Sequence, residues 1–470
     1  MTEFKIYARG KFIRGVSKLD IINPYTGKSF AYTWLASQDQ LEFAIQSAMD
    51  VTEEMKTLPV YKKFGILKQI AQKLDTAKKD FAEHLSKESG KPFRYAMAEV
   101  ERAIQTFTIA AEESKRLPKE YMSLDWTPAG EKKEGFVKYF PVGLVAGISP
   151  FNFPLNLAAH KIAPAIAAGC PIILKPSSLT PISPLKLAEI IDSTDLPKGA
   201  VSVLPMDRQT GNHLVTDERF KLLSFTGSPE VGWKMKNDAG KKKVLLELGG
   251  NAGVIVTPTA NMEVAVKKCL LGGFSYSGQV CIHAQRIYVH RDIFKIFVDG
   301  FVQGATCLKA GDPLDPETEI SSMIDEENAI RVEQWVMEAL AGGAQLICGG
   351  ERKGSFFPPT VLTGTDPSMK VCYREIFGPV VVVEPYTDFE EAVDHINNSR
   401  YGLQAGVFTN LIEEMNVAFD QLEVGGVMIN EVPAFRVDQM PYGGIKDSGL
   451  GREGVKYAIM EMMEPKLMVK

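Results

Sequence analysis

The sequence predicts an α/β fold with two main domains and a smaller third unit, on three observations. Short apolar runs alternate with helical segments between about 136 and 256, which is typical of a parallel sheet built from βαβ units. The same alternation recurs less regularly over 253–430. A polar stretch with Pro and Gly at 117–135 interrupts a helical pattern and is typical of a linker or an extended hairpin. At about 150 residues per domain, the 470 residues also allow about three units.

The elements are expected in the following order along the chain. Residues 1–20 and the turn-rich 22–30 predict short strands. Between about 38 and 116, apolar residues at spacings of three and four predict helices. Strands are then expected at 143–149, 171–175, 201–204, 221–225 and 244–248, with helices near 155–168, 183–193, 209–216 and 230–240. Later candidate strands are GVIV, QRIYVH, VVVVEP and GGVMIN.

Composition excludes several classes of function. Hydrophobic residues make up 45% of the chain and charged residues 24%, so a large core can be buried. The net charge of -5 leaves no electrostatic footprint for nucleic acid or an anionic membrane. The most apolar segment, 155–174, contains His160, Lys161 and two prolines, which excludes a membrane span.

The cysteines indicate a reducing compartment. Six Cys and six His show no Cys-x-x-Cys and no ligand-like array, so no metal site is predicted. The N-terminus, MTEFKIYARGKFIRG, carries charges throughout and is not a secretory signal. The protein is therefore expected in the cytoplasm.

The segment KLLSFTGSPEVG is a candidate phosphate site. A strand ends at Phe225 and a tight turn with Gly227 follows, while Ser228 is a good N-cap and Pro229 suits the first helical position. Phosphates bind at such helix N-termini beside the carboxyl ends of parallel strands. An ordinary capped helix would show the same pattern. The single Gly-x-Gly-x-x-Gly match, within 448–454, is interpreted as coincidence because no strand is predicted before it.

Lys175 ends the apolar run PIILK at the same edge of the predicted sheet. Its ammonium group can reach a ribose hydroxyl or a phosphate there, or it can simply be solvated. This residue therefore supports a nucleotide site only in combination with other motifs.

Three further residues are candidates for chemistry. Cys281 lies in a loop of small residues, where a thiol is accessible enough to act as a nucleophile, although a structural role is an alternative. Glu247 ends an apolar strand before a Gly pair, and burial there would raise its pKa toward that of a general base; it can instead cap a neighbouring helix. Asn152 lies between Pro150 and Pro154, which suits either a fixed oxyanion donor or a plain turn.

Taken in order, these motifs resemble the aldehyde dehydrogenase superfamily, in its hydrolytic, NAD(P)-dependent branch. The resemblance runs from about residue 20 to the C-terminus, and the 34 residues from Glu247 to Cys281 (281 − 247) fit that family. The motifs are PFNFP with Asn152, LKPS with Lys175, FTGSPEVG, ELGGN, GQVC, EIFGP and PYGGIKDSG.

The resemblance implies a mechanism and a substrate class. Cys281 attacks an aldehyde, the Asn152 amide and the Cys281 N–H hold the oxyanion, a hydride passes to NAD or NADP, and Glu247 activates the hydrolytic water. Arg102, on a helix that this family places beside the substrate tunnel, and Arg436 are candidates to bind an anionic tail; each can instead form a structural salt bridge. A small aldehyde, anionic or hydroxylated, is the expected substrate.

The resemblance to the aldehyde dehydrogenase superfamily also implies which residues bind the cofactor and where the domain boundaries lie. Many NAD-specific members have Glu where this chain has Ser178, and such a carboxylate would repel a 2′-phosphate, so we expect NADP to be accepted. The expected cofactor residues are Ser149, Phe151, Lys175, Ser178, Gly227, Ser228, Glu375 and Phe377. The expected units are a Rossmann-like dinucleotide-binding domain (1–118 and 142–247), an α/β catalytic domain (248–455) and a small β oligomerisation hairpin (119–141 and 456–470). The C-terminal segment is expected to join that hairpin across a subunit boundary of a homodimer or homotetramer.

Two alternatives remain at this stage. A CoA-acylating relative would use a thiol in place of water, but Glu247 disfavours it because such relatives generally lack this base. A non-catalytic structural protein on the same scaffold is disfavoured by the joint presence of Cys281, Glu247 and Asn152.

Overall fold

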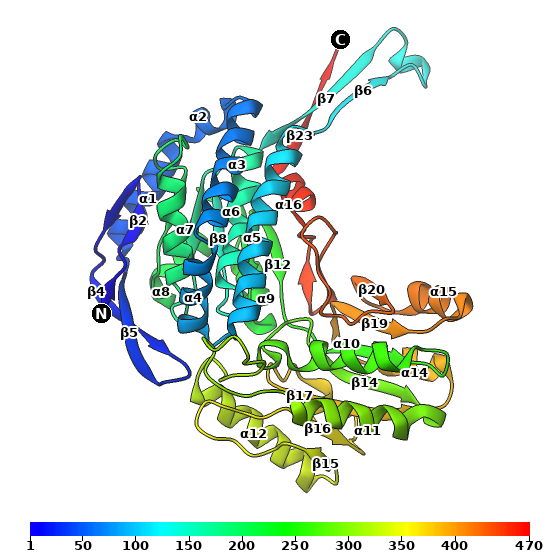
Figure 1. The fold of residues 1–470 in the computed structure, drawn as a ribbon. Coiled ribbons are helices and arrows are strands. Elements are labelled where there is room, and N and C mark those ends of the chain that lie inside the picture. Colours follow the sequence, from blue (N-terminus) through cyan, green and yellow to red (C-terminus); the bar gives the residue numbers. More distant parts are fainter.

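A computed structural model describes all residues, 1–470, and Figure 1 shows two sheets with flanking helices and a projecting arm. The first sheet has the strand order β22-β12-β11-β8-β9-β10-β2-β3. Its five central strands, β12 to β10, pair in parallel, which confirms the predicted βαβ pattern. The bounds are β2 (Ile6–Ala8), β3 (Lys11–Ile13), β8 (Val145–Ile148), β9 (Ile172–Lys175), β10 (Val201–Val203), β11 (Leu222–Thr226), β12 (Lys243–Glu247) and β22 (Gly449–Leu450).

Helices cover both faces of this sheet because their apolar stripes must be buried against it. The helix α6 is buried along its whole length, packed against α3 and α5, and it forms the centre of the largest hydrophobic core. The bounds are α1 (Gln38–Asp50), α2 (Thr52–Thr57), α3 (Val60–Thr76), α4 (Lys78–Ser89), α5 (Phe93–Ser114), α6 (Pro154–Ala168), α7 (Ile182–Asp192), α8 (Arg208–Thr216), α9 (Pro229–Asp238) and α16 (Val455–Glu461).

The second sheet has the order β15-β16-β17-β14-β13-β19-β20 and is parallel except for its edge strand β15. Its strands are β13 (Ala252–Val256), β14 (Ala284–His290), β15 (Gln345–Cys348), β16 (Thr360–Thr363), β17 (Val380–Tyr386), β19 (Gln404–Phe408) and β20 (Gly426–Ile429). Its helices are α10 (Met262–Phe274), α11 (Arg291–Cys307), α12 (Glu326–Ala341), α13 (Lys370–Tyr373), α14 (Phe389–Asn397) and α15 (Ile412–Gln421).

Three strands of the second sheet, β15, β16 and β19, were not among the expected ones. The strand β19 is fully buried but reads QAGVF, so it carries no continuous apolar run, while β15 is largely exposed. The remaining short elements are β1 (Thr2–Glu3), β4 (Ser17–Asn23), β5 (Lys28–Leu35), β18 (Tyr401–Gly402), β21 (Ile445–Lys446) and the 3₁₀ turns η1 (Pro128–Gly130) and η2 (Ser275–Gly278).

The projecting arm is a three-stranded sheet of β6 (Lys119–Ser123), β7 (Glu134–Pro141) and β23 (Met463–Val469). The strand β23 pairs with β7 of the same chain, from Met463 opposite Pro141 to Val469 opposite Gly135. The expectation that the C-terminal segment joins the hairpin across a subunit boundary is therefore wrong. The reason is that α16 packs on α6 and delivers the chain directly to the base of β7. Residues 456–461 belong to that helix and not to the arm.

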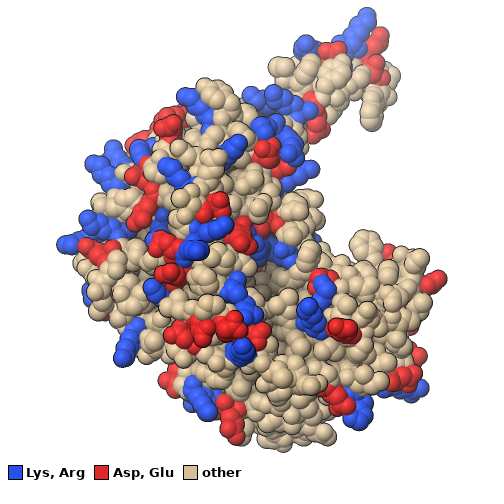
Figure 2. Space-filling view, viewed as in Figure 1, with Lys and Arg blue, Asp and Glu red and all other residues tan.

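The surface carries no extended area of one charge on the face that Figure 2 shows, where Lys and Arg are interspersed with Asp and Glu. No helix is both long and apolar enough to cross a membrane. The arm projects beyond the body and exposes Tyr121 and Trp126.

Candidate active site

A cavity of about 690 Å³ lies between the carboxyl ends of β11 and β12 and the loops of the second sheet. In α/β proteins this edge of a parallel sheet is the usual ligand site. Ten of the thirteen residues expected from the sequence line the cavity: Arg102, Phe151, Asn152, Gly227, Ser228, Glu247, Cys281, Glu375, Phe377 and Arg436.

The other three expected residues lie outside this cavity. Ser149 is buried at the end of β8, where its N–H donates to Lys175 O at 3.1 Å and its hydroxyl has no partner. The partly buried Lys175 side chain packs beside Gly211 on α8. Ser178 lines a separate hollow of about 820 Å³. The cavity therefore brings the three catalytic candidates together with most of the expected cofactor residues, and the three residues that lie outside it all belong to the expected cofactor set.

The Gly pair after Glu247 allows two parts of the site to approach each other. A Cβ on Gly250 would lie 2.2 Å from the backbone oxygen of Cys281, and one on Gly249 would lie 2.2 Å from Oε2 of Glu375. Contacts this short are impossible for a real Cβ, so larger residues would push these groups apart.

Cys281 follows the 3₁₀ turn η2, in which Tyr276 and Ser277 adopt positive φ angles. Its Sγ lies 3.1 Å from the hydroxyl oxygen of Tyr442. Burial raises the pKa of the Cys281 thiol to about 11, while the Tyr442 hydrogen bond and the charge of Arg436 act in the opposite direction. The thiol is therefore mostly protonated near neutral pH, and each neighbour that favours the thiolate increases the reactive fraction.

Asn152 is buried beside the Cys281 loop. Its amide Nδ2 donates to Gln279 O at 3.0 Å, two residues before the nucleophile candidate. Its backbone oxygen accepts a 2.7 Å hydrogen bond from Lys91 Nζ, and Lys91 is paired with Glu99, with both side chains fully buried. The ammonium of Lys91 also lies 3.8 Å from the centroid of the Phe153 ring. These contacts hold the Asn152 backbone firmly.

Glu247 ends β12 with only 5% of its surface exposed, and its Oε2 atom has no hydrogen-bond partner. Burial, and then the nearby charge of Glu453, raise its pKa well above the usual carboxyl range. A carboxyl group with a pKa raised in this way is suited to accept a proton in the working pH range.

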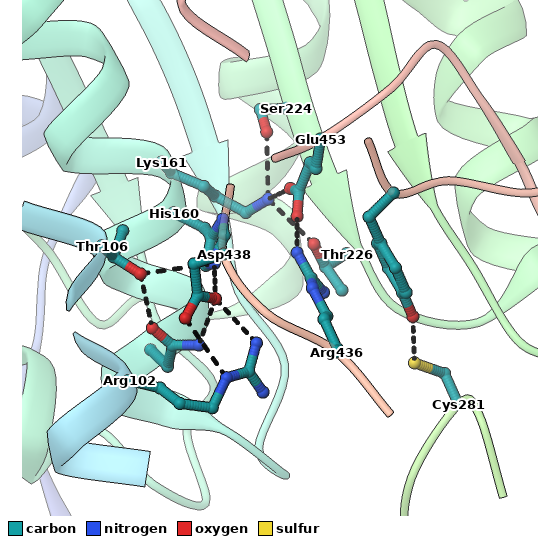
Figure 3. A network of polar contacts seen from close by, with 12 residues as sticks. Arg102, Thr106, His160, Lys161, Ser224, Thr226, Cys281, Arg436, Asp438 and Glu453 are labelled. Carbon is teal, nitrogen blue, oxygen red and sulfur yellow. Dashed lines mark hydrogen bonds and ion pairs between the residues drawn. The ribbon is translucent and has the colours of Figure 1, made fainter. Parts of the chain in front are cut away.

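A buried ionic network connects the sheet to the loop that carries Arg436 (Figure 3). Lys161 donates to Ser224 at 3.0 Å and to Thr226 at 2.8 Å, and its Nζ lies 3.3 Å from Glu453. Arg436 donates to the other Glu453 oxygen at 3.3 Å. Burial alone would raise the pKa of Glu453, but the charges of its partners lower it, so Glu453 is ionised.

Arg102 is part of a second polar cluster in Figure 3. It donates to Asp438 at 2.7 Å, and Asp438 also lies 2.6 Å from His160 Nε2. Although burial opposes ionisation, His160 and Arg102 lower the pKa of Asp438. Both arginines thus make the ion pairs that the sequence left as an alternative, and both also line the cavity.

Arg436 and Arg102 differ in their exposure to solvent and in whether a donor nitrogen remains without a partner. Only 6% of the Arg436 side chain is exposed, and its Nε has no hydrogen-bond partner. Burial would lower its pKa, but Tyr442, Glu453 and Glu247 raise it, so the guanidinium stays charged. Arg102 is 28% exposed and uses both Nε and Nη2 on Asp438.

The cofactor side of the cavity contains Glu375 and Phe377. Burial raises the pKa of Glu375 to about 7, and one of its oxygens accepts from the Gly250 N–H at 2.9 Å. Phe377 has a positive φ of 46° and meets the Phe151 ring edge-to-face at 5.8 Å. A positive φ in a bulky residue is strained, and such strain is common at functional sites.

The N-terminus of α9 is available to a phosphate group. Ser228 is the N-cap residue, yet its side chain makes no capping hydrogen bond, and Pro229 occupies the first turn. The helix N–H groups at the cavity wall are therefore free to bind an anion. The N-terminus of α9 therefore suits the pyrophosphate of a dinucleotide. Separately, no group of three or more His, Cys, Asp or Glu side chains is placed to hold a metal ion.

The sequence analysis gave no role to five residues in or near the site. Arg331 and Tyr442 line the cavity, and Lys91, Lys161 and Glu453 form buried ion pairs behind its walls. Two signals were available. Tyr442 lies within the motif PYGGIKDSG, and Lys161 is a charged residue within an apolar helix, where a buried Lys needs a partner. Glu453 lies in the segment 448–454, whose Gly pattern is interpreted as coincidence and gives this acid no role. Arg331, on α12, carries no local signal.

The parallel sheet, with a free helix N-terminus and a cavity at its carboxyl edge, places the protein among the α/β dehydrogenases that bind a dinucleotide. The sequence model of the aldehyde dehydrogenase family matches residues 12–468. The chain belongs to the aldehyde dehydrogenase family, as its motifs indicated. It is an NAD(P)-dependent enzyme that oxidises an aldehyde.

Several relatives are similar over nearly the whole chain. A 3-sulfolactaldehyde dehydrogenase of Priestia aryabhattai is 42% identical over 468 residues, covering 99% of this chain and 98% of that protein. A lactaldehyde dehydrogenase of Methanococcus aeolicus is 41% identical over 456 residues, covering 96% and 97%.

Among solved structures, aldehyde dehydrogenase 21 of Physcomitrella patens, in complex with the reaction product succinate, has a TM-score of 0.99. It is 44% identical in sequence, with 100% of this chain and 98% of that one covered. The glyceraldehyde-3-phosphate dehydrogenase GapN of Methanocaldococcus jannaschii, complexed with NADP, has a TM-score of 0.93 at 39% identity, covering 96% and 98%. These structures confirm the predicted fold class.

Proposed function

We propose that this enzyme oxidises a small aldehyde with an anionic tail, with or without a hydroxyl group, to the carboxylic acid. The observation that carries the proposal is the buried, charged Arg436, whose Nε has no partner and which lines the same cavity as Cys281. A buried donor without an acceptor is costly, and an anionic group supplies the missing acceptor.

The names of the relatives support this substrate class. One relative is named for an aldehyde with a sulfonate group, one for an aldehyde with a hydroxyl group, and a third holds the dicarboxylate succinate as its product. Arg102 and Arg436 come from different elements, α5 and the loop before β21, and both reach the cavity wall. We assign Arg436 as the main contact and Arg102 as the second.

The first chemical step is proposed to occur at Cys281. The thiolate adds to the aldehyde carbon, a C–S bond forms, and the carbonyl electron pair moves to oxygen. The Asn152 amide and the Cys281 N–H donate to this oxyanion, and the Asn152 amide already lies against the Cys281 loop.

NAD or NADP, when bound, supplies the hydride acceptor that makes the adduct a thioester. The N-terminus of α9 with Gly227 and Ser228 would hold the pyrophosphate, and Glu375 with Phe377 would border the nicotinamide end. Glu247 then takes a proton from water, the hydroxide adds to the thioester carbon, and the C–S bond breaks to release the acid and the thiolate. Ser178 carries no charge to repel a 2′-phosphate, which supports use of NADP.

The proposal is tested with a panel of aldehydes assayed with NAD and NADP side by side. The panel pairs succinic semialdehyde and 3-sulfolactaldehyde with lactaldehyde and neutral butyraldehyde. In the parent enzyme, kcat/KM is expected to be highest for the anionic substrates. Arg436→Met should lower it for them by about 10–100-fold, equivalent to about 1.5–3 kcal/mol for a charged hydrogen bond. An equal loss for butyraldehyde would contradict the role of Arg436 in binding the tail.

A CoA-acylating reaction is the second candidate, and the buried Glu247 with its raised pKa favours hydrolysis instead. Acyl-CoA formation from aldehyde, CoA and NAD(P) would decide between them. The exposed aromatic side chains of the arm support assembly as a homodimer or homotetramer. A nucleophilic thiol requires a reducing environment, which supports a cytoplasmic location.

A further inference from the structure

We propose that Tyr442 is a positioning residue for the nucleophile: its hydroxyl holds Cys281 Sγ and stabilises the thiolate by donating a hydrogen bond to it. The inference rests on the role of Cys281 as the nucleophile of the proposed function. It gives a role to a residue of the motif PYGGIKDSG to which the sequence analysis assigned no chemistry.

The position of Tyr442 is set from both sides. Its hydroxyl oxygen lies 3.1 Å from Cys281 Sγ, and only 2% of the residue is exposed. Its ring packs in a small apolar cluster with Ile282 and Leu403. The guanidinium of Arg436 lies 3.6 Å from the ring centroid, held by its ion pair with Glu453. The ring therefore cannot turn away from the thiol without breaking buried contacts.

Donation from tyrosine to sulfur is the direction that matters for reactivity. A thiolate has no proton, so in that state the hydroxyl must be the donor. Burial raises the pKa of Tyr442 well above its usual value, which keeps the proton on the phenol when the thiol ionises. A hydrogen bond that is stronger to the charged form favours that form, so Tyr442 opposes the effect of burial on Cys281.

Three other groups with charge face this pair. Arg436 stabilises the thiolate, whereas Glu375 and Glu247 disfavour it when they are ionised. The same Arg436 and Glu247 act on Tyr442 with the corresponding signs. A change confined to the Tyr442 hydroxyl leaves these three charges in place, so its effect on the thiol can be measured separately.

The test compares Tyr442→Phe with the parent enzyme in the absence of aldehyde. Iodoacetamide labelling of the Cys281 peptide is followed by mass spectrometry across pH, which separates it from the exposed Cys307. The labelling midpoint is expected to rise by about one pH unit, so labelling at pH 7.5 should be about tenfold slower. Tyr386→Phe is the matched control, because it removes another buried tyrosine hydroxyl, bonded to Val256 O outside the cavity.

A second variant covers the case in which Tyr442→Phe does not fold. Placing 3-fluorotyrosine at position 442 keeps the ring and the hydroxyl but makes the hydroxyl a stronger donor, so the labelling midpoint should move down. An unchanged or lowered midpoint in folded Tyr442→Phe, or an unchanged or raised one with 3-fluorotyrosine, would overturn the inference. Because labelling needs no turnover, this outcome is distinct from a failure of the proposed function, which would appear as no activity on the aldehyde panel.

Discussion

Replacing Lys91 with Met is expected to destabilise the protein, to loosen the loop between β8 and α6 that contains Asn152, and to lower kcat. Lys91 and Glu99 are fully buried as an ion pair, and Lys91 also holds the Asn152 backbone oxygen at 2.7 Å. Removing one partner of a buried pair costs about 3–5 kcal/mol, because the remaining charge is left without compensation. The released loop carries the proposed oxyanion donor, so kcat should fall by at least about tenfold.

A double-mutant cycle separates the ion pair from general packing. In Glu99→Gln the side-chain oxygen can still accept from the Leu155 and Asn156 N–H groups, which it receives at 2.9 and 3.1 Å in the parent. Combined with Lys91→Met, it removes both charges, so the double variant should lose no more stability than either single variant. The coupling between the two is then about 3 kcal/mol or more.

The assay is urea unfolding followed by tryptophan fluorescence, together with steady-state kcat. Lys68→Met is the control, because Lys68 is exposed and its ammonium lies over the Phe64 ring without a buried ion pair. The loss of stability in this variant should stay within about 0.5 kcal/mol. Strictly additive losses in the Lys91 and Glu99 cycle would refute the reasoning that each charge stabilises the other.

Glu247→Gln should slow turnover by about 10²–10⁴-fold while a first equivalent of NAD(P)H still forms in a stopped-flow burst; loss of the burst would instead place Glu247 before hydride transfer. Burial raises the pKa of Glu88 from 4.5 to about 7, so its contribution to stability is full below about pH 4.5 and lost as pH rises through about 7. In the parent, the free energy of unfolding from urea titrations should therefore fall by about 3 kcal/mol between pH 4.5 and pH 7, and in Glu88→Gln this fall should be absent. A pH profile of stability that is the same in both proteins would contradict this. Ser178→Glu should lower kcat/KM for NADP at least about tenfold relative to kcat/KM for NAD. If kcat/KM of the parent enzyme is already a hundredfold lower with NADP than with NAD, the expected role of Ser178 is wrong.

The fold was largely predictable because its signals are local. The strands β8 to β12 are short apolar runs separated by helices, and each was expected within one or two residues of its observed bounds. Two of the exceptions have clear physical reasons: β19 is buried without an apolar run, and the partner of β23 depends on where α16 docks. Neither is visible in a window of neighbouring residues.

The sequence by itself determined the α/β class, the family and the residue types available for thiol chemistry, because apolar periodicity and short motifs are properties of adjacent residues. Only the tertiary structure decided what surrounds those residues. Tyr442 lies 161 positions from Cys281 in sequence and within hydrogen-bond distance in space. The same is true of Lys161 and Glu453, 292 positions apart. Burial and long-range partners set the charge and pKa of a side chain, and these exist only once the chain has folded.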